Sequence, residues 1–100
     1  MKKLKKVLII SALALTATTA TIAYAYRYDV EGGTWEYGYT YGINAYSDYY
    51  HSDNNHGSKV INRNNGNSAV DNADPGVWSR AWIWDVWDPA TFRYNPTGWY

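Results

Sequence analysis

Large aromatic side chains and small or polar residues alternate along Gly33–Ile43, and this pattern predicts a β-strand. The large side chains stand at every second position: Trp35, Tyr37, Tyr39, Tyr41 and Ile43. Alternate side chains of a strand point to opposite faces. A helix would instead scatter these rings around its axis and would enclose Gly38 and Gly42, at about 1 kcal/mol each. We therefore expect a strand whose aromatic face is buried in the core.

The rest of the chain has the pattern of short strands separated by turns. Tyr26–Gly32 is polar and is followed by a second glycine, so we expect it to be a loosely held arm. Further strands are predicted for residues 45–51, 56–62, 68–71, 77–87 and 91–94. Asn65-Gly66 predicts a hairpin, because both central residues of the tightest turns need positive φ. Five to six short strands indicate one small all-β domain, a sandwich or a barrel.

Residues 77–87 form the second major element and are unusually rich in tryptophan. Apolar side chains occupy both parities of this stretch, with Trp78, Trp82, Trp84 and Val86 on one and Ala81, Ile83 and Trp87 on the other. A strand that is apolar on both faces is expected to be central in its sheet or half covered by a partner. One thin core cannot bury all of Trp82, Trp84 and Trp87, so some of them are expected at the surface or against a ligand.

The first 25 residues have the pattern of an export signal. Four lysines at positions 2, 3, 5 and 6 precede an apolar run, and Ala23-Tyr24-Ala25 has the A-x-A form that signal peptidase accepts. We expect a helical signal peptide over residues 1–25, cleavage between Ala25 and Tyr26, and a secreted mature domain over residues 26–100. An uncleaved membrane anchor is the alternative, but a spanning helix needs about 20 apolar residues and threonines dilute this run.

Removing that segment makes the chain acidic. It would keep five basic residues against nine acidic ones, five minus nine giving a net charge of −4 with neutral histidines. Such a charge argues against a nucleic-acid partner, whose binding rests on neutralised phosphates, and against charge-driven insertion into anionic membranes. The chain has no cysteine, so aromatic packing or oligomerisation must replace the disulfides common in small secreted domains.

Candidate binding residues follow from the few cations and the surplus of tryptophans. The candidates for binding a pyrophosphate or a carboxylate are the cations Lys59, Arg63 and Arg80. The aromatic candidates are Trp82, Trp84 and Trp87. We expect His51 and His56 to be surface residues that flank a polar loop rather than metal ligands, because a zinc site needs three or four ligands at recognisable spacing. No paired carboxylates or nucleophile motif can be recognised, so we predict a protein that is not an enzyme and needs no cofactor.

Four blocks of the chain resemble the lactococcin 972 family of bacteriocins. In order they are Glu31-Gly32-Gly33-Thr34-Trp35, Ala45-Tyr46-Ser47-Asp48-Tyr49, His56-Gly57-Ser58-Lys59 and Gly76-Val77-Trp78-Ser79-Arg80-Ala81, behind a signal peptide and before an aromatic C-terminal tail. The chain departs from the family pattern in the longer loop at residues 52–55 and in the tryptophan-rich stretch at residues 82–87.

The resemblance implies a secreted antibacterial protein folded as a small antiparallel β-sandwich. It further implies binding of the cell-wall precursor lipid II, or another component of the target envelope, and blocked septum formation in dividing Gram-positive cells. Homodimers and a membrane transporter that gives the producer immunity are also implied. The residues themselves leave two alternatives open: a secreted carbohydrate-binding or adhesive module that uses exposed tryptophans, and a structural dimer or assembly subunit.

Overall fold

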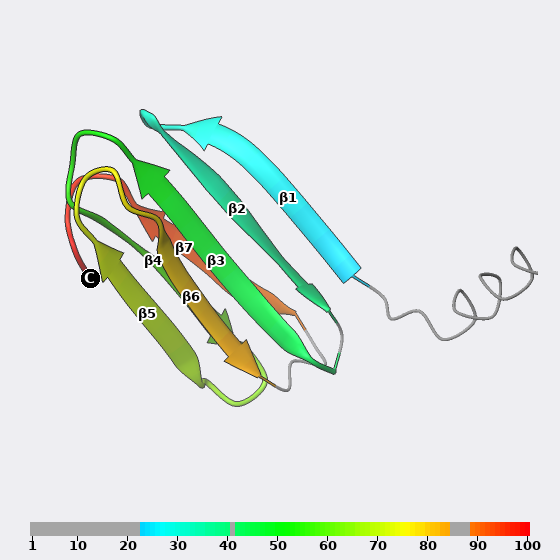
Figure 1. Cartoon of the computed structure of the whole chain (residues 1–100). Helices are drawn as coiled ribbons and strands as arrows, with labels where there is room; N and C mark the ends of the chain where they lie inside the picture. The colour runs from blue at the N-terminus through cyan, green and yellow to red at the C-terminus, as the bar shows by residue number, and fades with distance from the viewer. Residues whose placement is uncertain (1–22, 41, 85–88) are drawn as a thin grey trace, which may run out of the picture.

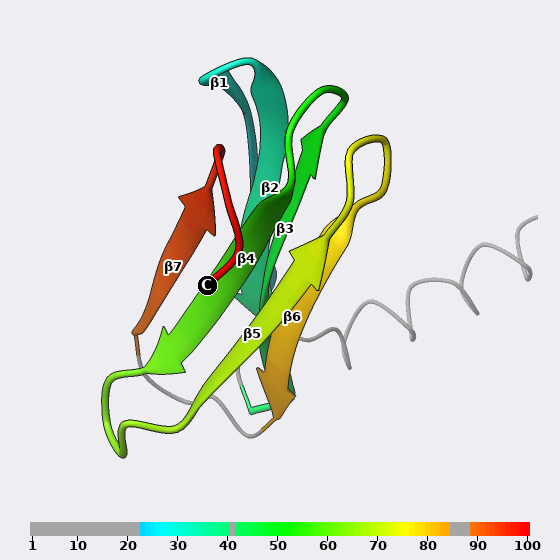
Figure 2. The ribbon, with the colours of Figure 1, turned by 90° about the vertical axis from the view of Figure 1, so that its left-hand side faces the viewer.

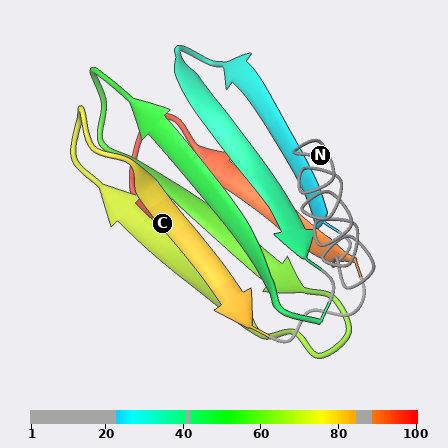
Figure 3. The ribbon, with the colours of Figure 1, turned by 45° about the vertical axis from the view of Figure 1, so that its right-hand side comes forward.

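The computed structural model describes residues 23–40, 42–84 and 89–100, which form seven antiparallel strands in two sheets (Figure 1). The strands are β1 (Ala23–Val30), β2 (Gly33–Thr40), β3 (Asn44–His51), β4 (His56–Asn62), β5 (Ser68–Ala73), β6 (Ser79–Trp84) and β7 (Ala90–Asn95). The larger sheet has the order β1-β2-β3-β6 and the smaller sheet the order β5-β4-β7. Figure 3 shows the larger sheet in front of β4 and β7. The predicted all-β sandwich is confirmed, with seven strands instead of five or six.

The additional strand is β1, which includes most of the segment that we expected to be a loose arm. It pairs with β2 along its whole length, with Tyr26 opposite Tyr37 and Val30 opposite Gly33. Glu31 and Gly32 form the connecting turn with φ values of 51° and 83°, and two positive φ values are typical of tight hairpin turns. The expectation was wrong because the polar residues of this segment hid the alternation of its tyrosines.

The centre of the core is made of small side chains rather than of the aromatic face of β2. Ala45, Val60 and Ala81 are buried there, and Tyr49 is the largest side chain that is completely buried. The rings on β2 are half-buried, and they pack against β7: Trp35 contacts Tyr94, and Tyr37 and Tyr39 stack on Phe92. The expectation that this face is buried in the core is therefore confirmed only in part, because Trp35, Tyr37 and Tyr39 face the other sheet but stay half-buried. Tyr41 lies outside the described residues.

The physical reason is the different width of the two sheets. The smaller sheet has three strands and the larger has four, so β1 extends past the edge of the layer opposite. Its residues Tyr26 and Tyr28 remain 45% and 49% exposed although their rings stack with Tyr37. The aromatic face of β2 thus borders the core instead of filling it.

Hydrogen-bonded serines join the two sheets. Ser47 donates its hydroxyl to the Arg93 carbonyl oxygen at 2.8 Å and accepts a hydrogen bond from Trp35 Nε1 at 3.0 Å. Ser79 donates to the Tyr49 carbonyl oxygen at 3.1 Å, and its oxygen lies 3.0 Å from Ser58 Oγ. Each such bond contributes about 1 kcal/mol net, and the short side chains let the sheets approach closely.

Gly33 makes room for the buried Tyr49. A Cβ atom at Gly33 would lie 2.5 Å from the Tyr49 hydroxyl oxygen and 2.2 Å from the Tyr50 carbonyl oxygen. The Tyr49 hydroxyl donates to the Val30 carbonyl oxygen at 2.9 Å. The glycine therefore fixes β3 against the β1–β2 turn, and any larger residue at this position would push them apart.

The hairpin predicted at Asn65-Gly66 joins β4 to β5, but its loop is longer than the tightest turn. Gly66 has a φ of 80°, and Asn65 is not among the described residues with positive φ. The Asn62 amide donates to the Asn67 carbonyl oxygen at 2.7 Å and so closes the loop. No described stretch forms a helix long and apolar enough to cross a membrane.

The tryptophan-rich strand β6 lies at the edge of the larger sheet, so the first of the two alternatives, a central position, was wrong, while cover by a partner stays a prediction. Figure 2 shows β6 running beside β5 of the other sheet. There the Arg80 amide donates to Asp71 Oδ2 at 2.7 Å, so a side chain from β5 occupies one hydrogen-bonding position of the open edge. Only the inward Ser79 and Ala81 of β6 are buried. The outward side chains of β6 therefore face solvent and not a second layer.

Candidate functional site

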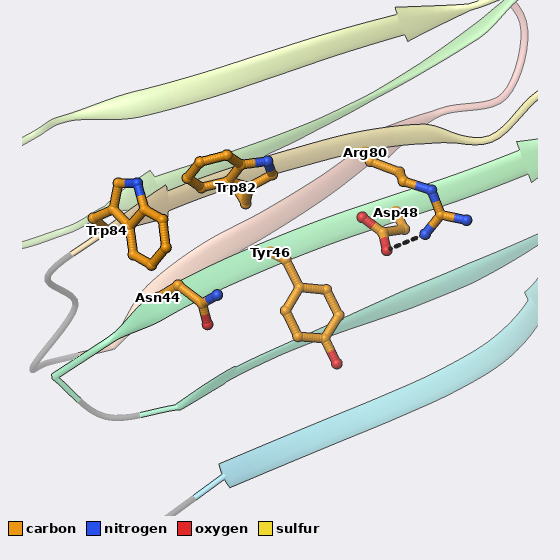
Figure 4. Close-up of a pocket in the computed structure, with 6 residues that line it drawn as sticks. All are labelled: Asn44, Tyr46, Asp48, Arg80, Trp82 and Trp84. Carbon is orange, nitrogen blue, oxygen red and sulfur yellow. Dashed lines mark hydrogen bonds and ion pairs between the residues drawn. The ribbon is translucent and has the colours of Figure 1, made fainter.

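The outward side chains of β3 and β6 form a groove on the larger sheet. The two strands pair with Asn44 opposite Trp84, Tyr46 opposite Trp82 and Asp48 opposite Arg80. These three cross-strand pairs share one face because the side-chain period of a strand is two. Together they line a hollow of about 280 Å³ (Figure 4). The groove therefore combines two indoles, a phenol, an amide and one ion pair.

The two tryptophans form a corner instead of a flat platform. Trp82 is 49% exposed and Trp84 is 60% exposed. Their ring centroids lie 4.8 Å apart with the planes at 79°, an edge-to-face contact. Aromatic pairs favour this arrangement, so each ring holds the other in place while about half of its surface stays open to a ligand. The prediction that some of the surplus tryptophans lie at the surface is confirmed for this pair.

The charged end of the groove is an ion pair that is held from several sides. Arg80 Nη1 donates to Asp48 Oδ2 at 3.2 Å (Figure 4). The Arg80 guanidinium also lies over the Trp78 ring, 5.2 Å from its centroid, in a cation–π contact. Two contacts therefore restrain the only guanidinium that lines the groove among the described residues.

Asp48 is held in an environment that disfavours its charge. Its side chain is 12% exposed, and burial raises the pKa of Asp48 from 3.8 to about 6, with a smaller contribution from the nearby Asp71 carboxylate. The Arg80 guanidinium acts in the opposite direction but does not cancel the effect of burial. Burial, and then the Asp48 carboxylate, raise the pKa of the Tyr46 phenol. The carboxylate is therefore a strong hydrogen-bond acceptor that is largely shielded from solvent.

The groove continues across the sheet toward β1. Tyr46 also lines a second hollow of about 270 Å³, together with Ala25, Tyr26, Arg27 and Glu36. The residue opposite Tyr46 on β2 is the buried Gly38, and the Tyr46 ring extends from β3 toward β2 (Figure 4). Arg27 and Glu36 form an ion pair at the far end. The two hollows therefore adjoin at the Tyr46 ring on the outer face of the larger sheet.

The structure brings together three of the six predicted binding residues. Arg80, Trp82 and Trp84 line the groove, whereas Lys59 lies on the other sheet with its ammonium over the Tyr100 ring. Arg63 is exposed just beyond the end of β4. Trp87 lies outside the described residues. Of the three candidate cations, Arg80 is therefore the one that lines the groove.

Asn44, Tyr46 and Asp48 were not among the predicted binding residues. Tyr46 and Asp48 stand at alternate positions of the strand predicted for residues 45–51, so the sequence indicates that they share a face; Asn44 precedes that predicted strand and belongs to β3 in the structure. The sequence does not indicate that β6, far along the chain, pairs with that strand. The groove therefore depends on a long-range strand pairing that the sequence pattern does not reveal.

Both histidines are buried, so the expectation that they are surface residues was wrong. His51 Nδ1 accepts hydrogen bonds from the amides of Asp53 and Asn54, both at 3.1 Å. The His56 ring nitrogens lie 2.8 Å from the Asn54 carbonyl oxygen and 2.6 Å from that of Val77. The rings thus organise the loop at residues 52–55. The described residues contain no group of three or more His, Cys, Asp or Glu side chains placed to hold a metal ion.

The predicted cleavage site lies at the start of β1. Ala23 and Ala25 are paired with Thr40 and Gly38, so cleavage before Tyr26 would shorten β1 from its free end and leave Tyr26–Val30 on β2. Cleavage itself stays a prediction.

Comparison with known proteins assigns the chain to a family. Residues 31–92 match the family model described as bacteriocin (Lactococcin_972). A solved structure named Lactococcin 972 is 38% identical and has a TM-score of 0.56, and the match covers 63% of this chain and 96% of that one. No curated protein matches the chain. Because the family model spans more than half of the sequence, the chain belongs to the lactococcin 972 family of bacteriocins.

Proposed function

We propose that the chain is exported, inhibits dividing Gram-positive bacteria and does so by binding a cell-wall precursor such as lipid II in the groove between β3 and β6. Sequestering the precursor would block septum and wall synthesis without a chemical step by the protein. Family membership supports the antibacterial activity, and the pattern of the first 25 residues supports export. Homodimers and an immunity transporter in the producer stay predictions.

The choice of this site rests on one observation, the exposed Trp82–Trp84 corner beside the Asp48–Arg80 ion pair. Exposed tryptophans in a concave surface with a few convergent polar groups are typical of binding sites. The aromatic rings on the inner face are engaged with β7 or with one another. The groove thus offers aromatic surface that the fold does not use for packing.

The test is growth inhibition by the secreted product of the full gene. The purified protein is applied to dividing Gram-positive cells with and without added lipid II, and we expect inhibition that lipid II relieves. Trp82→Ala with Trp84→Ala should weaken inhibition by about 30-fold or more, because buried aromatic contacts at binding centres are often worth 2 kcal/mol or more. Trp99→Ala is the matched control, since Trp99 is 54% exposed but does not line the groove.

Two results would argue against the proposal. Absence of inhibition across a broad panel of Gram-positive species would contradict the antibacterial function of this chain. Equal loss of activity in the groove variant and in the Trp99→Ala control would contradict the choice of site. Retention on isolated cell walls without any inhibition would instead favour a carbohydrate-binding or adhesive module.

A further inference from the structure

We propose that the groove binds an uncharged sugar ring of a glycan, of the N-acetylated amino sugar class, and that it does not bind the diphosphate of a cell-wall precursor. This inference rests on the proposed function and specifies which part of an envelope ligand the groove recognises. Three observations support it: the local charge, the arrangement of the rings and the length of the path across the sheet.

The charge around the groove disfavours a diphosphate. Arg80 is the cation of the groove, and its guanidinium is already paired with Asp48 at 3.2 Å and seated over Trp78. A second carboxylate, that of Asp71, accepts the backbone amide hydrogen of Arg80 at 2.7 Å. Asp71 does not line the groove, but its charge acts on Asp48. The two carboxylates and one guanidinium sum to a local charge of about −1, and a diphosphate would add like charge to it. Sites that hold phosphate groups usually supply positive charge that neighbouring carboxylates do not neutralise.

The side chains complement a neutral sugar. A sugar ring has apolar C–H faces and polar hydroxyl edges, so it suits a site in which aromatic surface and hydrogen-bonding groups meet. Trp82 and Trp84 meet edge to face. One indole can therefore stack on the face of a sugar ring while the other contacts its edge. Opposite them, Asp48 accepts hydrogen bonds, and the Asn44 amide both donates and accepts. The Arg80 side chain is 58% exposed, so its other N–H groups are open to a hydroxyl or an acetamide oxygen.

The path across the sheet is longer than one sugar ring. Tyr46 lines both the groove and the second hollow, so the two hollows adjoin at its ring. Adjacent strands lie about 4.8 Å apart, so the distance from β6 to β1 across three spacings is about 14 Å. Predicted cleavage after Ala25 would remove one wall of the second hollow and leave its end open. We therefore infer that linked sugars bind more tightly than a single ring.

The test is calorimetric titration of the full chain with neutral oligomers of N-acetylglucosamine and, separately, with inorganic pyrophosphate. We expect saturable binding of the tetramer at least about tenfold tighter than binding of the monomer, and no saturable binding of pyrophosphate. Asp48→Ala and Trp82→Ala should each weaken tetramer binding by about tenfold or more. Arg93→Gln and Trp99→Ala are the controls for charge and for tryptophan, since neither residue lines the groove.

Three results would overturn the inference. The first is pyrophosphate binding that Arg80→Gln abolishes, and the second is absence of sugar binding by a correctly folded chain. Sugar binding that persists in both groove variants would equally exclude this location. If the chain inhibits growth and lipid II relieves the effect, but sugars do not bind, the inference fails while the proposed function stands. If sugars bind but no growth is inhibited, the proposed function fails instead.

Discussion

Replacing Asp48 with asparagine tests whether the groove is held under electrostatic strain. The Asp48 carboxyl lies mostly out of solvent, and burial raises its pKa from 3.8 to about 6. The folded chain therefore binds this proton more tightly than the unfolded chain does. Between about pH 4 and pH 6 the folded state carries the additional proton, so raising the pH through this window lowers the free energy of unfolding.

The size of the effect follows from the two pKa values. The difference between 3.8 and about 6 corresponds to at most about 3 kcal/mol. The groove is open to water on one side, which reduces the expected effect to about 1–2 kcal/mol. Asp48→Asn removes this dependence but also removes the partner of Arg80, and an exposed ion pair contributes about 0.2–1 kcal/mol. At pH 7.5 we expect the variant to be as stable as the natural chain or more stable by about 1 kcal/mol.

The assay is urea unfolding of both chains at several pH values between 4 and 7.5. As the pH rises over this range, the free energy of unfolding of the natural chain should fall by about 1–2 kcal/mol more than that of Asp48→Asn. The difference between the two chains isolates the contribution of Asp48. Asp53→Asn, in the exposed part of the loop at residues 52–55, is the control for the loss of one negative charge. Parallel pH profiles for the natural chain and Asp48→Asn would refute the reasoning.

Three further predictions concern the fold and the export signal. Gly33→Ala should lower the free energy of unfolding by about 2–4 kcal/mol in chemical denaturation, because its Cβ would collide with a backbone oxygen; Gly66→Ala, with open space around it but a φ of 80°, should cost only about 1–2 kcal/mol. Tyr49→Phe should cost about 1–3 kcal/mol in the same assay, since it leaves the Val30 carbonyl oxygen without this donor. Mass spectrometry of culture supernatant should find a product that begins at Tyr26, and a secreted species that keeps the N-terminal lysines would contradict the predicted cleavage.

The strands could be predicted from the sequence wherever their alternation is strong. The aromatic alternation of Gly33–Thr40 and the turn residues around it locate β2, and similar signals locate β3 to β7. β1 escaped prediction because its tyrosines stand among charged residues. The edge position of β6 could not be predicted, because a strand that is apolar on both faces is typical of the middle of a sheet. In β6 the outward apolar residues face solvent, which patterning alone cannot distinguish from burial.

The candidate site could be predicted only in part, for a related reason. Surplus tryptophan indicated β6 as the place of contact, and Trp82 and Trp84 do line the groove. The other wall is β3, and the sequence does not state that these strands are neighbours. The same limit applies to the cations: Lys59 and Arg80 look alike in a list of charges, although Lys59 stands on β4 of the smaller sheet and Arg80 on β6 of the larger.

The distribution of aromatic residues separates stability from recognition in this fold. The sheets are joined by small buried residues and by hydrogen-bonded serines, with a row of half-buried rings along β2 and β7. These contacts take the place of disulfides in a chain without cysteine. Trp82 and Trp84 contribute little to that packing, because they touch each other on the open face of an edge strand. Their exposure has a cost in solubility and gives the fold no compensating burial, so we infer that binding a ligand is the reason they stand there.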